Sequence, residues 1–334
     1  MIFGFRGPRY ILMAMCVLVG ASLAAREATA QADAAKDFPS RPVHIVVGFA
    51  AGGGNDIFAR VVGQKLSEIL KQPVVVDNKP GAGARIAAEF VAKANPDGYT
   101  TMVAASGAMV MAEAIYPKLN YDPQHDFVPI TEIAHFPLVL VVSGKSPYKT
   151  IQDLVAYAKA NASKANYASV SPTFQIATEL FKLRTGMPAE MVAYKSSGEM
   201  VMAVISGEAL CTFTDMPPVA GHLQSGEVRV LAVTGPKRLP ELPDVPTLEE
   251  AGIKDATIEI WSGIFVPKAT PPAIVAKLEA AAMEAVKSPD VADRLRNLGV
   301  EPSGMPGAEF ARVIERDLHQ AVDVARAANV KVEE

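Results

Sequence analysis

Two glycine-rich turns hold the residues whose types and spacing are best suited to bind a ligand. The first, Gly52-Gly53-Gly54-Asn55-Asp56, follows an apolar run over residues 43–49 and precedes apolar residues at helical spacing over residues 57–70. A strand, a glycine turn and a helix N-terminus in this order form an anion site, because free N–H groups and the positive end of the helix dipole point the same way. Either Asn55 or Asp56 is expected to cap the helix.

The bound anion is expected to be a carboxylate rather than a phosphate. A Walker loop beginning at Gly48 would need Lys and then Ser or Thr after Gly53, where the chain has Gly54 and Asn55. The second turn, over residues 81–86, has Ile86 where a dinucleotide-binding loop has its last glycine. The alternative, that both turns only tighten a connection between strand and helix, stays open.

Enzymatic chemistry finds little support in the sequence. The five histidines show no metal-ligand spacing, and the patterns H-E-x-x-H, C-x-x-C and G-x-S-x-G are absent. Cys211 is interpreted as a buried small hydrophobic residue rather than a nucleophile. No catalytic residue, metal or cofactor is therefore predicted, and an exported α/β enzyme is kept only as a third hypothesis.

The first 30 residues are predicted to be a secretory signal peptide. Arg6 and Arg9 precede an apolar run at residues 11–23 that is too short to span a bilayer, and Ala28-Thr29-Ala30 offers a small-x-small cleavage site. Cleavage near Ala30 would remove three arginines and one glutamate, which lowers the formal net charge from −4 to −6. An acidic chain without a basic run is not expected to bind nucleic acid. The exported protein is expected to be a periplasmic monomer.

The remaining chain alternates strand and helix patterns, which predicts an α/β fold, and its length favours two domains. We expect strands at residues 43–49, 73–76, 99–104, 137–142, 166–170, 191–194, 210–214, 228–234 and 259–266. We expect helices at residues 57–70, 85–94, 106–115, 151–160, 172–184, 197–205, 273–286, 289–298 and 308–327. Because ligands of open α/β sheets bind beyond the carboxyl ends of strands, the loops at those ends are expected to face a cleft that closes by hinge motion.

Eight short motifs in this order resemble the solute-binding proteins of tripartite tricarboxylate transporters, the Bug or TctC family. They are Phe38-Pro39-Ser40-Arg41-Pro42, Gly52-Gly53-Gly54-Asn55-Asp56, Asn78-Lys79-Pro80-Gly81-Ala82-Gly83, Pro96-Asp97-Gly98-Tyr99-Thr100, Asn166-Tyr167-Ala168-Ser169, Leu242-Pro243-Asp244-Val245-Pro246-Thr247, Trp261 with Gly263, and Thr270-Pro271-Pro272. The chain departs from the family pattern at Ala50, at Arg85-Ile86, between Ser169 and Gln175, and at Ser196-Ser197.

The resemblance implies a two-domain periplasmic binding fold, with a mostly parallel sheet in each domain and a ligand cleft between them. Residues 38–142 and 263–334 would form the first domain and residues 143–262 the second. The implied function is capture of a small di-, tri- or aromatic carboxylate and its delivery to membrane transporter subunits. The residues predicted to contact the ligand are Phe49, Ala51, Gly53, Gly54, Asn55, Asp56, Gly83, Arg85, Ser106, Ser171, Thr173, Phe174, Tyr194 and Asp215.

Several of these side chains have a second interpretation. Arg85 could pair with a carboxylate or be a solvated arginine in the first helical turn. Trp261 is expected to be a core residue, whereas Phe174, in a predicted loop, could stack on an aromatic ligand. Asp215 could accept a ligand hydrogen bond or cap the following turn. A periplasmic sensor that presents the bound carboxylate to a signalling partner is the alternative function.

Overall fold

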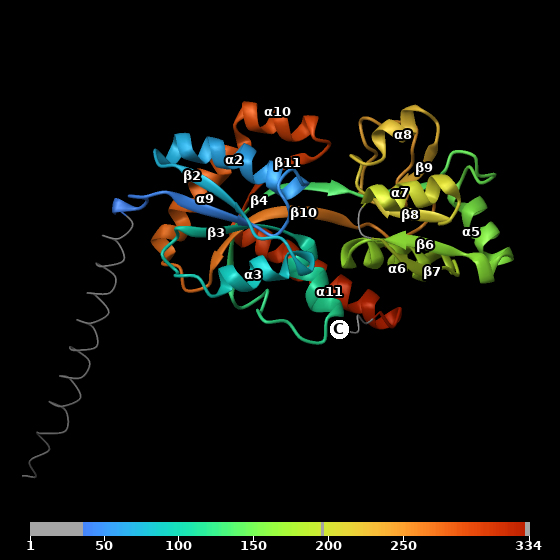
Figure 1. The fold of residues 1–334 in the computed structure, drawn as a ribbon, viewed down its shortest axis with the longest axis horizontal. Helices are drawn as coiled ribbons and strands as arrows, with labels where there is room; N and C mark the ends of the chain where they lie inside the picture. The colour runs from blue at the N-terminus through green and yellow to red at the C-terminus, as the bar shows by residue number, and fades with distance from the viewer. Residues whose placement is uncertain (1–35, 195–196, 331–334) are drawn as a thin grey trace, which may run out of the picture.

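The computed structural model describes residues 36–194 and 197–330 and contains two β-sheets, each flanked by helices (Figure 1). The predicted signal peptide and Ser196 lie outside the described residues. The two sheets form two lobes that lie side by side in Figure 1. The predicted two-domain α/β fold is therefore confirmed.

The first sheet has six strands in the order β11-β4-β10-β3-β1-β2. Its strands are β1 (Val43–Val47), β2 (Val74–Asn78), β3 (Thr100–Ala105), β4 (Phe127–Pro137), β10 (Glu259–Pro267) and β11 (Glu301–Pro306). Strands β2, β1 and β3 pair in parallel, whereas β10 is antiparallel to β3 and β4, and β11 is antiparallel to β4. The carboxyl ends of β1, β2 and β3 consequently meet at one edge of the sheet.

The second sheet has five strands in the order β7-β6-β8-β5-β9. Its strands are β5 (Val139–Ser143), β6 (Asn166–Ser169), β7 (Glu190–Ala193), β8 (Cys211–Thr214) and β9 (Val228–Val233). Strand β6 pairs in parallel with β7 and β8, and β5 is antiparallel to β8 and β9. Both sheets are thus mixed, and the expectation of mostly parallel sheets is wrong in that detail.

The chain passes between the sheets at two places. Strand β4 ends at Pro137 in the first sheet and β5 begins at Val139 in the second, and the chain returns between β9 and β10. The sequence-based boundary at residues 142 and 143 would assign β5 to the first domain, although its pairing partners belong to the second sheet. The exact domain limits stay a prediction, and sheet membership favours a first crossing near Leu138.

Helices cover both faces of each sheet (Figure 1). Those of the first lobe are α2 (Gly54–Leu70), α3 (Arg85–Ala92), α4 (Ala112–Ile115), α9 (Pro272–Lys287), α10 (Pro289–Asn297) and α11 (Gly307–Ala327). Those of the second lobe are α5 (Ile151–Ala160), α6 (Pro172–Thr185), α7 (Ser197–Ser206) and α8 (Ala220–Gln224). Helices α2, α9 and α10 lie on one side of the first sheet, and α3 and α11 lie on the other. Among the described residues, no helix combines the length and apolar composition needed to cross a bilayer.

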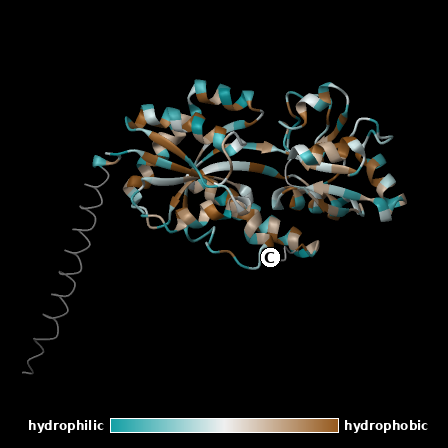
Figure 2. Ribbon diagram, in the orientation of Figure 1, coloured by the Kyte–Doolittle hydropathy of each residue, from teal (hydrophilic) through white to brown (hydrophobic). Residues whose placement is uncertain are grey.

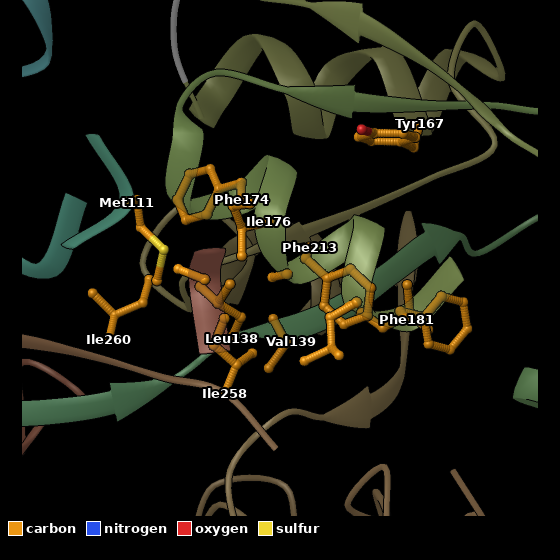
Figure 3. Packing of buried hydrophobic residues seen from close by; sticks show 14 of the residues in the cluster. Met111, Leu138, Val139, Tyr167, Phe174, Ile176, Phe181, Phe213, Ile258 and Ile260 are labelled. Atoms are coloured by element: carbon orange, nitrogen blue, oxygen red, sulfur yellow. The ribbon is translucent and has the colours of Figure 1, made fainter. Parts of the chain in front are cut away.

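Large apolar side chains fill the core between these layers. Hydrophobic residues (brown) follow the strands in the middle of both lobes, whereas the outer helices carry both hydrophobic (brown) and hydrophilic (teal) residues (Figure 2). Trp261 is 1% exposed and packs edge-on against Phe310 of α11, with ring centroids 4.8 Å apart, which confirms it as a core residue. Phe181 and Phe213 form a similar pair in the second lobe at 5.4 Å (Figure 3). Burial of one such side chain contributes about 1.5–3 kcal/mol.

Strands β4 and β11 were not predicted from the sequence. Strand β4 contains Pro129 and Pro137 and a polar stretch, and its pairing with β10 has two register shifts. These shifts interrupt the period-two alternation on which strand prediction depends. Strand β11 contains two prolines and a glycine and lies at the sheet edge, where proline is tolerated.

Candidate functional site

The first glycine turn connects β1 to α2 without a side-chain cap on the helix. Helix α2 begins at Gly54, its N-cap residue is Gly53, and no side chain makes a capping hydrogen bond there. The expectation that Asn55 or Asp56 caps the helix is therefore wrong, because both residues lie inside the first turn. Ala51, Gly52 and Gly54 are exposed, but the amide of Gly52 donates to Asp56 Oδ2 (2.9 Å) and that of Gly53 donates to Ala50 O (3.2 Å).

Asp56 is buried beneath this turn and its carboxylate is fully used by protein donors. Its Oδ2 accepts hydrogen bonds from Gly52 N (2.9 Å) and Arg60 Nε (3.0 Å). Its Oδ1 forms an ion pair with Arg60 Nη2 (2.9 Å) and accepts a hydrogen bond from Asn78 Nδ2 (2.9 Å). The hydrogen bond from Arg60, helped by those from Gly52 and Asn78, outweighs burial and lowers the pKa of Asp56 to about 2.

The second glycine turn is a short left-handed turn over three consecutive residues. Ala82, Gly83 and Ala84 have φ values of 48°, 62° and 73°, and Ala84 N donates to Gly81 O at 3.0 Å. Glycine adopts such angles without strain, but each alanine in this region costs of order 1–2 kcal/mol. Backbone strain of this kind concentrates at ligand sites, where the surrounding structure maintains it.

The second glycine turn packs against the end of β1, just before the first glycine turn. A Cβ atom added to Gly48 would overlap Ala84 Cβ and would lie 2.7 Å from Ala84 Cα, so only glycine fits between β1 and the second turn. Lys79 N also donates to Val47 O at 2.8 Å. The structure therefore brings together the two turns that the sequence singled out, at the carboxyl edge of the first sheet.

Arg85 follows the second turn and folds back onto its own neighbourhood. Its guanidinium lies 3.8 Å from the centroid of the Tyr116 ring, and its Nε donates to Ala82 O at 3.0 Å. These two contacts of the side chain stabilise the strained turn. A contact between Arg85 and the ligand stays a prediction.

Ser106 lies where the first sheet meets the second lobe. It follows β3 and is followed by a π-helical turn, Gly107–Met111 (η2), where a regular helix was expected. Such turns occur frequently at functional sites. The side chain is fully buried, and within the described residues its Oγ has no hydrogen-bond partner.

Two contacts connect the residues on either side of Ser106 to the other predicted loops. A Cβ added to Gly107 would lie 2.9 Å from Thr173 Oγ1, which places the start of α6 against the end of β3. Ser262 Oγ donates to Asn55 Oδ1 at 2.7 Å, and Ser262 pairs with Ala105 in the sheet. The starts of α2 and α6 are therefore joined through β10 and the end of β3.

The second lobe contributes the N-terminus of α6. Ser171 is its N-cap residue but makes no capping hydrogen bond, and Pro172 and the 6%-exposed Thr173 occupy its first turn. Phe174 lies in this helix, not in a loop as expected, and is 9% exposed, on the side of the core cluster toward Met111 (Figure 3). Its availability for stacking on a ligand is therefore limited.

Tyr194 and Asp215 follow β7 and β8, the two parallel strands on either side of β6. Burial raises the pKa of Tyr194, and the nearby Glu208 carboxylate raises it further. Glu208 lies shortly before the first residue of β8. Asp215 follows the end of β8 and accepts a hydrogen bond from Thr214 Oγ1 at 3.0 Å. Burial raises the pKa of Asp215.

Three residues of the site were missed in the sequence analysis. Arg60 and Asn78 complete the Asp56 network, and Ser262 binds Asn55. The spacing of four residues between Asp56 and Arg60 on one helix was a signal for their pairing. Ser262 gave no comparable signal, because its role depends on strand register between distant segments.

Known proteins share this architecture over most of the chain. Protein BugT of Bordetella pertussis is 32% identical over 301 residues, which cover 89% of this chain and 92% of that protein. The structure of Rpa4515 from R. palustris with adipate has 34% identity and a TM-score of 0.79, covering 88% of this chain and 99% of that one. MatC (Rpa3494) from Rhodopseudomonas palustris with bound malate has 31% identity and a TM-score of 0.76, covering 86% and 99%.

Two mixed sheets with converging loops, together with these neighbours, define a two-domain periplasmic solute-binding protein. The family model described as "Tripartite tricarboxylate transporter family receptor" matches residues 58–330. The chain belongs to this family, as the sequence motifs indicated.

Proposed function

We propose that this protein captures a small dicarboxylate in the periplasm and delivers it to the membrane subunits of a tripartite tricarboxylate transporter. One carboxylate would be held by backbone amides of the two glycine turns. The other end would contact Ser106, Ser171, Thr173 and Asp215. The protein would act as a monomer after cleavage near Ala30 and would bind neither nucleic acid nor a cofactor.

The observation that carries this proposal is the buried and unpartnered hydroxyl of Ser106. A buried hydroxyl without a hydrogen bond costs about 1–3 kcal/mol, so a ligand oxygen at this position would recover that free energy. Ser106 follows β3, and the next residue, Gly107, lies against Thr173 at the start of α6, so a ligand at this position could contact both lobes. The strained turn at Ala82 and Ala84 adds a second feature typical of ligand sites.

The ligands of the structural neighbours support the choice of ligand class. Rpa4515 contains adipate and MatC contains malate, which are both dicarboxylates. Two anionic ends suit a site built from helix N-termini and backbone amides on one lobe and hydroxyl groups on the other. Asp215 favours a ligand that also carries a hydrogen-bond donor, such as a hydroxyl group, at its distal end.

A thermal-shift screen of the purified protein over adipate, malate, citrate and benzoate tests the ligand class. A ligand present at a hundred times its Kd should add about 2.7 kcal/mol to the free energy of unfolding, and we expect a dicarboxylate to give the largest shift. The uncharged diamides serve as matched controls. The absence of a shift with every carboxylate, or turnover of any of them, would contradict the proposal.

Uptake by a deletion strain tests delivery separately from binding. Loss of carboxylate uptake, restored by the wild-type gene, is expected for a transport protein. Unchanged uptake combined with loss of a transcriptional response would instead assign the protein to a sensor.

A further inference from the structure

We propose that Asp56 is a positioning residue that shapes the first glycine turn, and that it does not itself contact the ligand. This inference rests on the proposed function, because it concerns the turn that would bind the carboxylate. It also reverses the expectation that Asp56 belongs to the ligand-contacting set.

The geometry leaves the Asp56 carboxylate no capacity for a ligand. Four donor contacts from Gly52, Arg60 and Asn78 occupy its two oxygens at 2.9–3.0 Å. The residue is 2% exposed, so it lies beneath the turn and not on its surface. An anion at this depth is tolerated because Arg60 forms a two-pronged ion pair with it.

The network contacts the connection between β1 and α2 at both Phe49 and Gly52. Asp56 holds the amide of Gly52 directly, and Asn78 Nδ2 donates to Phe49 O at 2.9 Å while it also binds Asp56. Arg60 Nη2 donates to Asn78 Oδ1 at 3.1 Å and closes the network. Residues 49–52 are therefore fixed between β1 and α2 even though α2 has no side-chain cap.

The sign of the effect on affinity separates positioning from simple electrostatics. Asp56 carries a negative charge near the site of an anionic ligand, so its removal would strengthen binding if charge alone mattered. If Asp56 fixes the amides of the turn, its removal weakens binding despite the loss of repulsion. A residue that directly held a ligand donor would instead change the preference among ligands.

The test is calorimetric titration of Asp56→Asn with the best dicarboxylate from the screen. We expect Kd to rise at least tenfold for adipate and malate alike. Asp97→Asn is the matched control, because Asp97 also accepts from an arginine (Arg41 Nη2, 2.9 Å) and from a backbone amide (Tyr99 N, 3.1 Å), but in a different turn. Unchanged or tighter binding by Asp56→Asn would overturn the inference.

Amide hydrogen exchange in the unliganded protein gives an independent readout. Exchange at Gly52 should accelerate at least tenfold in Asp56→Asn and stay unchanged in Asp97→Asn. Should Asp56→Asn not fold, Asn78→Ala, which keeps the ion pair, should show weaker binding and faster exchange in the same turn. If the variants exchange faster but the wild-type protein binds no carboxylate, the proposed function is wrong and the positioning role stands. If the wild-type protein binds a carboxylate but exchange and Kd are unchanged in the variants, the positioning role is wrong and the proposed function stands.

Discussion

The two regions that would hold the ligand differ in the groups they offer: backbone amides in the first lobe and buried side chains in the second. On the first lobe, two exposed glycine turns offer backbone amides, and a buried ionic network around Asp56 holds one of them in shape. On the second lobe, α6 begins with side chains that are largely buried, including Thr173 and Phe174. Backbone amides recognise any carboxylate, whereas buried side chains discriminate among shapes. The first region should therefore determine the class of ligand and the second its identity.

Replacing Gly48 with valine should have the largest effect, because it disrupts the contact between the end of β1 and the second glycine turn. The new side chain would overlap Ala84, whose backbone is fixed in the left-handed turn. We expect a loss of about 3 kcal/mol in the free energy of unfolding, together with loss of binding. Urea denaturation measures the loss of stability. Gly54→Ala is the control, since its Cβ would meet only Phe58 at an ordinary 3.8 Å. Equal stability of the two variants would refute the contact.

Ser106→Ala should separate ligand binding from stability. Removing an unpartnered buried hydroxyl should leave the unliganded protein equally stable or more stable by up to about 1 kcal/mol, while ligand affinity falls about tenfold. Thr234→Val is the contrasting variant, because Thr234 Oγ1 accepts from Leu138 N and donates to Ile258 O. That variant should lose about 1–3 kcal/mol of stability. Denaturation measures the stability of each variant and calorimetry its ligand affinity. A destabilised Ser106→Ala with normal affinity would contradict the proposal.

Arg85→Ala should affect stability more than affinity. Loss of the stacking on Tyr116 should cost about 0.5–1 kcal/mol, with a change in Kd below threefold. Arg41→Ala is a matched control, because Arg41 stacks on Tyr99 at the same distance of 3.8 Å in a different turn. A tenfold loss of affinity in Arg85→Ala alone would instead show that Arg85 pairs with the ligand.

Two carboxyl groups should give opposite pH dependences of stability, because their pKa values shift in opposite directions. The pKa of Asp56 is lowered to about 2, so its contribution to stability is present above pH 4 and is lost as the pH falls toward 2. Burial raises the pKa of Asp215, so the folded state takes up its proton first and this group adds stability as the pH falls from neutral through its raised pKa. Asp215→Asn should raise stability at pH 7 and abolish that rise. Denaturation at several pH values measures both, and an unchanged pH profile would contradict the burial of Asp215.

The sequence allowed prediction of the fold class and of the loops that meet, but not of how each side chain is used. Regular apolar periodicity located elements such as β1 and α2, and the glycine turns marked the carboxyl edge of the first sheet. Strand β4 was missed because its register shifts break the alternation. Whether the site residues contact a ligand stays a prediction.

The functions of Asp56 and Phe174 depended on tertiary contacts that local sequence does not encode. The partners of Asp56 include Asn78, which is 22 residues away, and the burial of Phe174 depends on the start of α6 packing toward the first lobe. Phe174 was treated as a loop residue, although the helix expected at residues 172–184, with Pro172 at its first position, already included it.

Calorimetric comparison of a dicarboxylate with its uncharged diamide tests the central claim most directly. We predict saturable binding of the acid at one site per chain and at least hundredfold weaker binding of the diamide, because the amides of the glycine turns would lose their anionic acceptor. Equal affinity for the acid and the diamide would contradict the account and would leave the glycine turns with a structural role only.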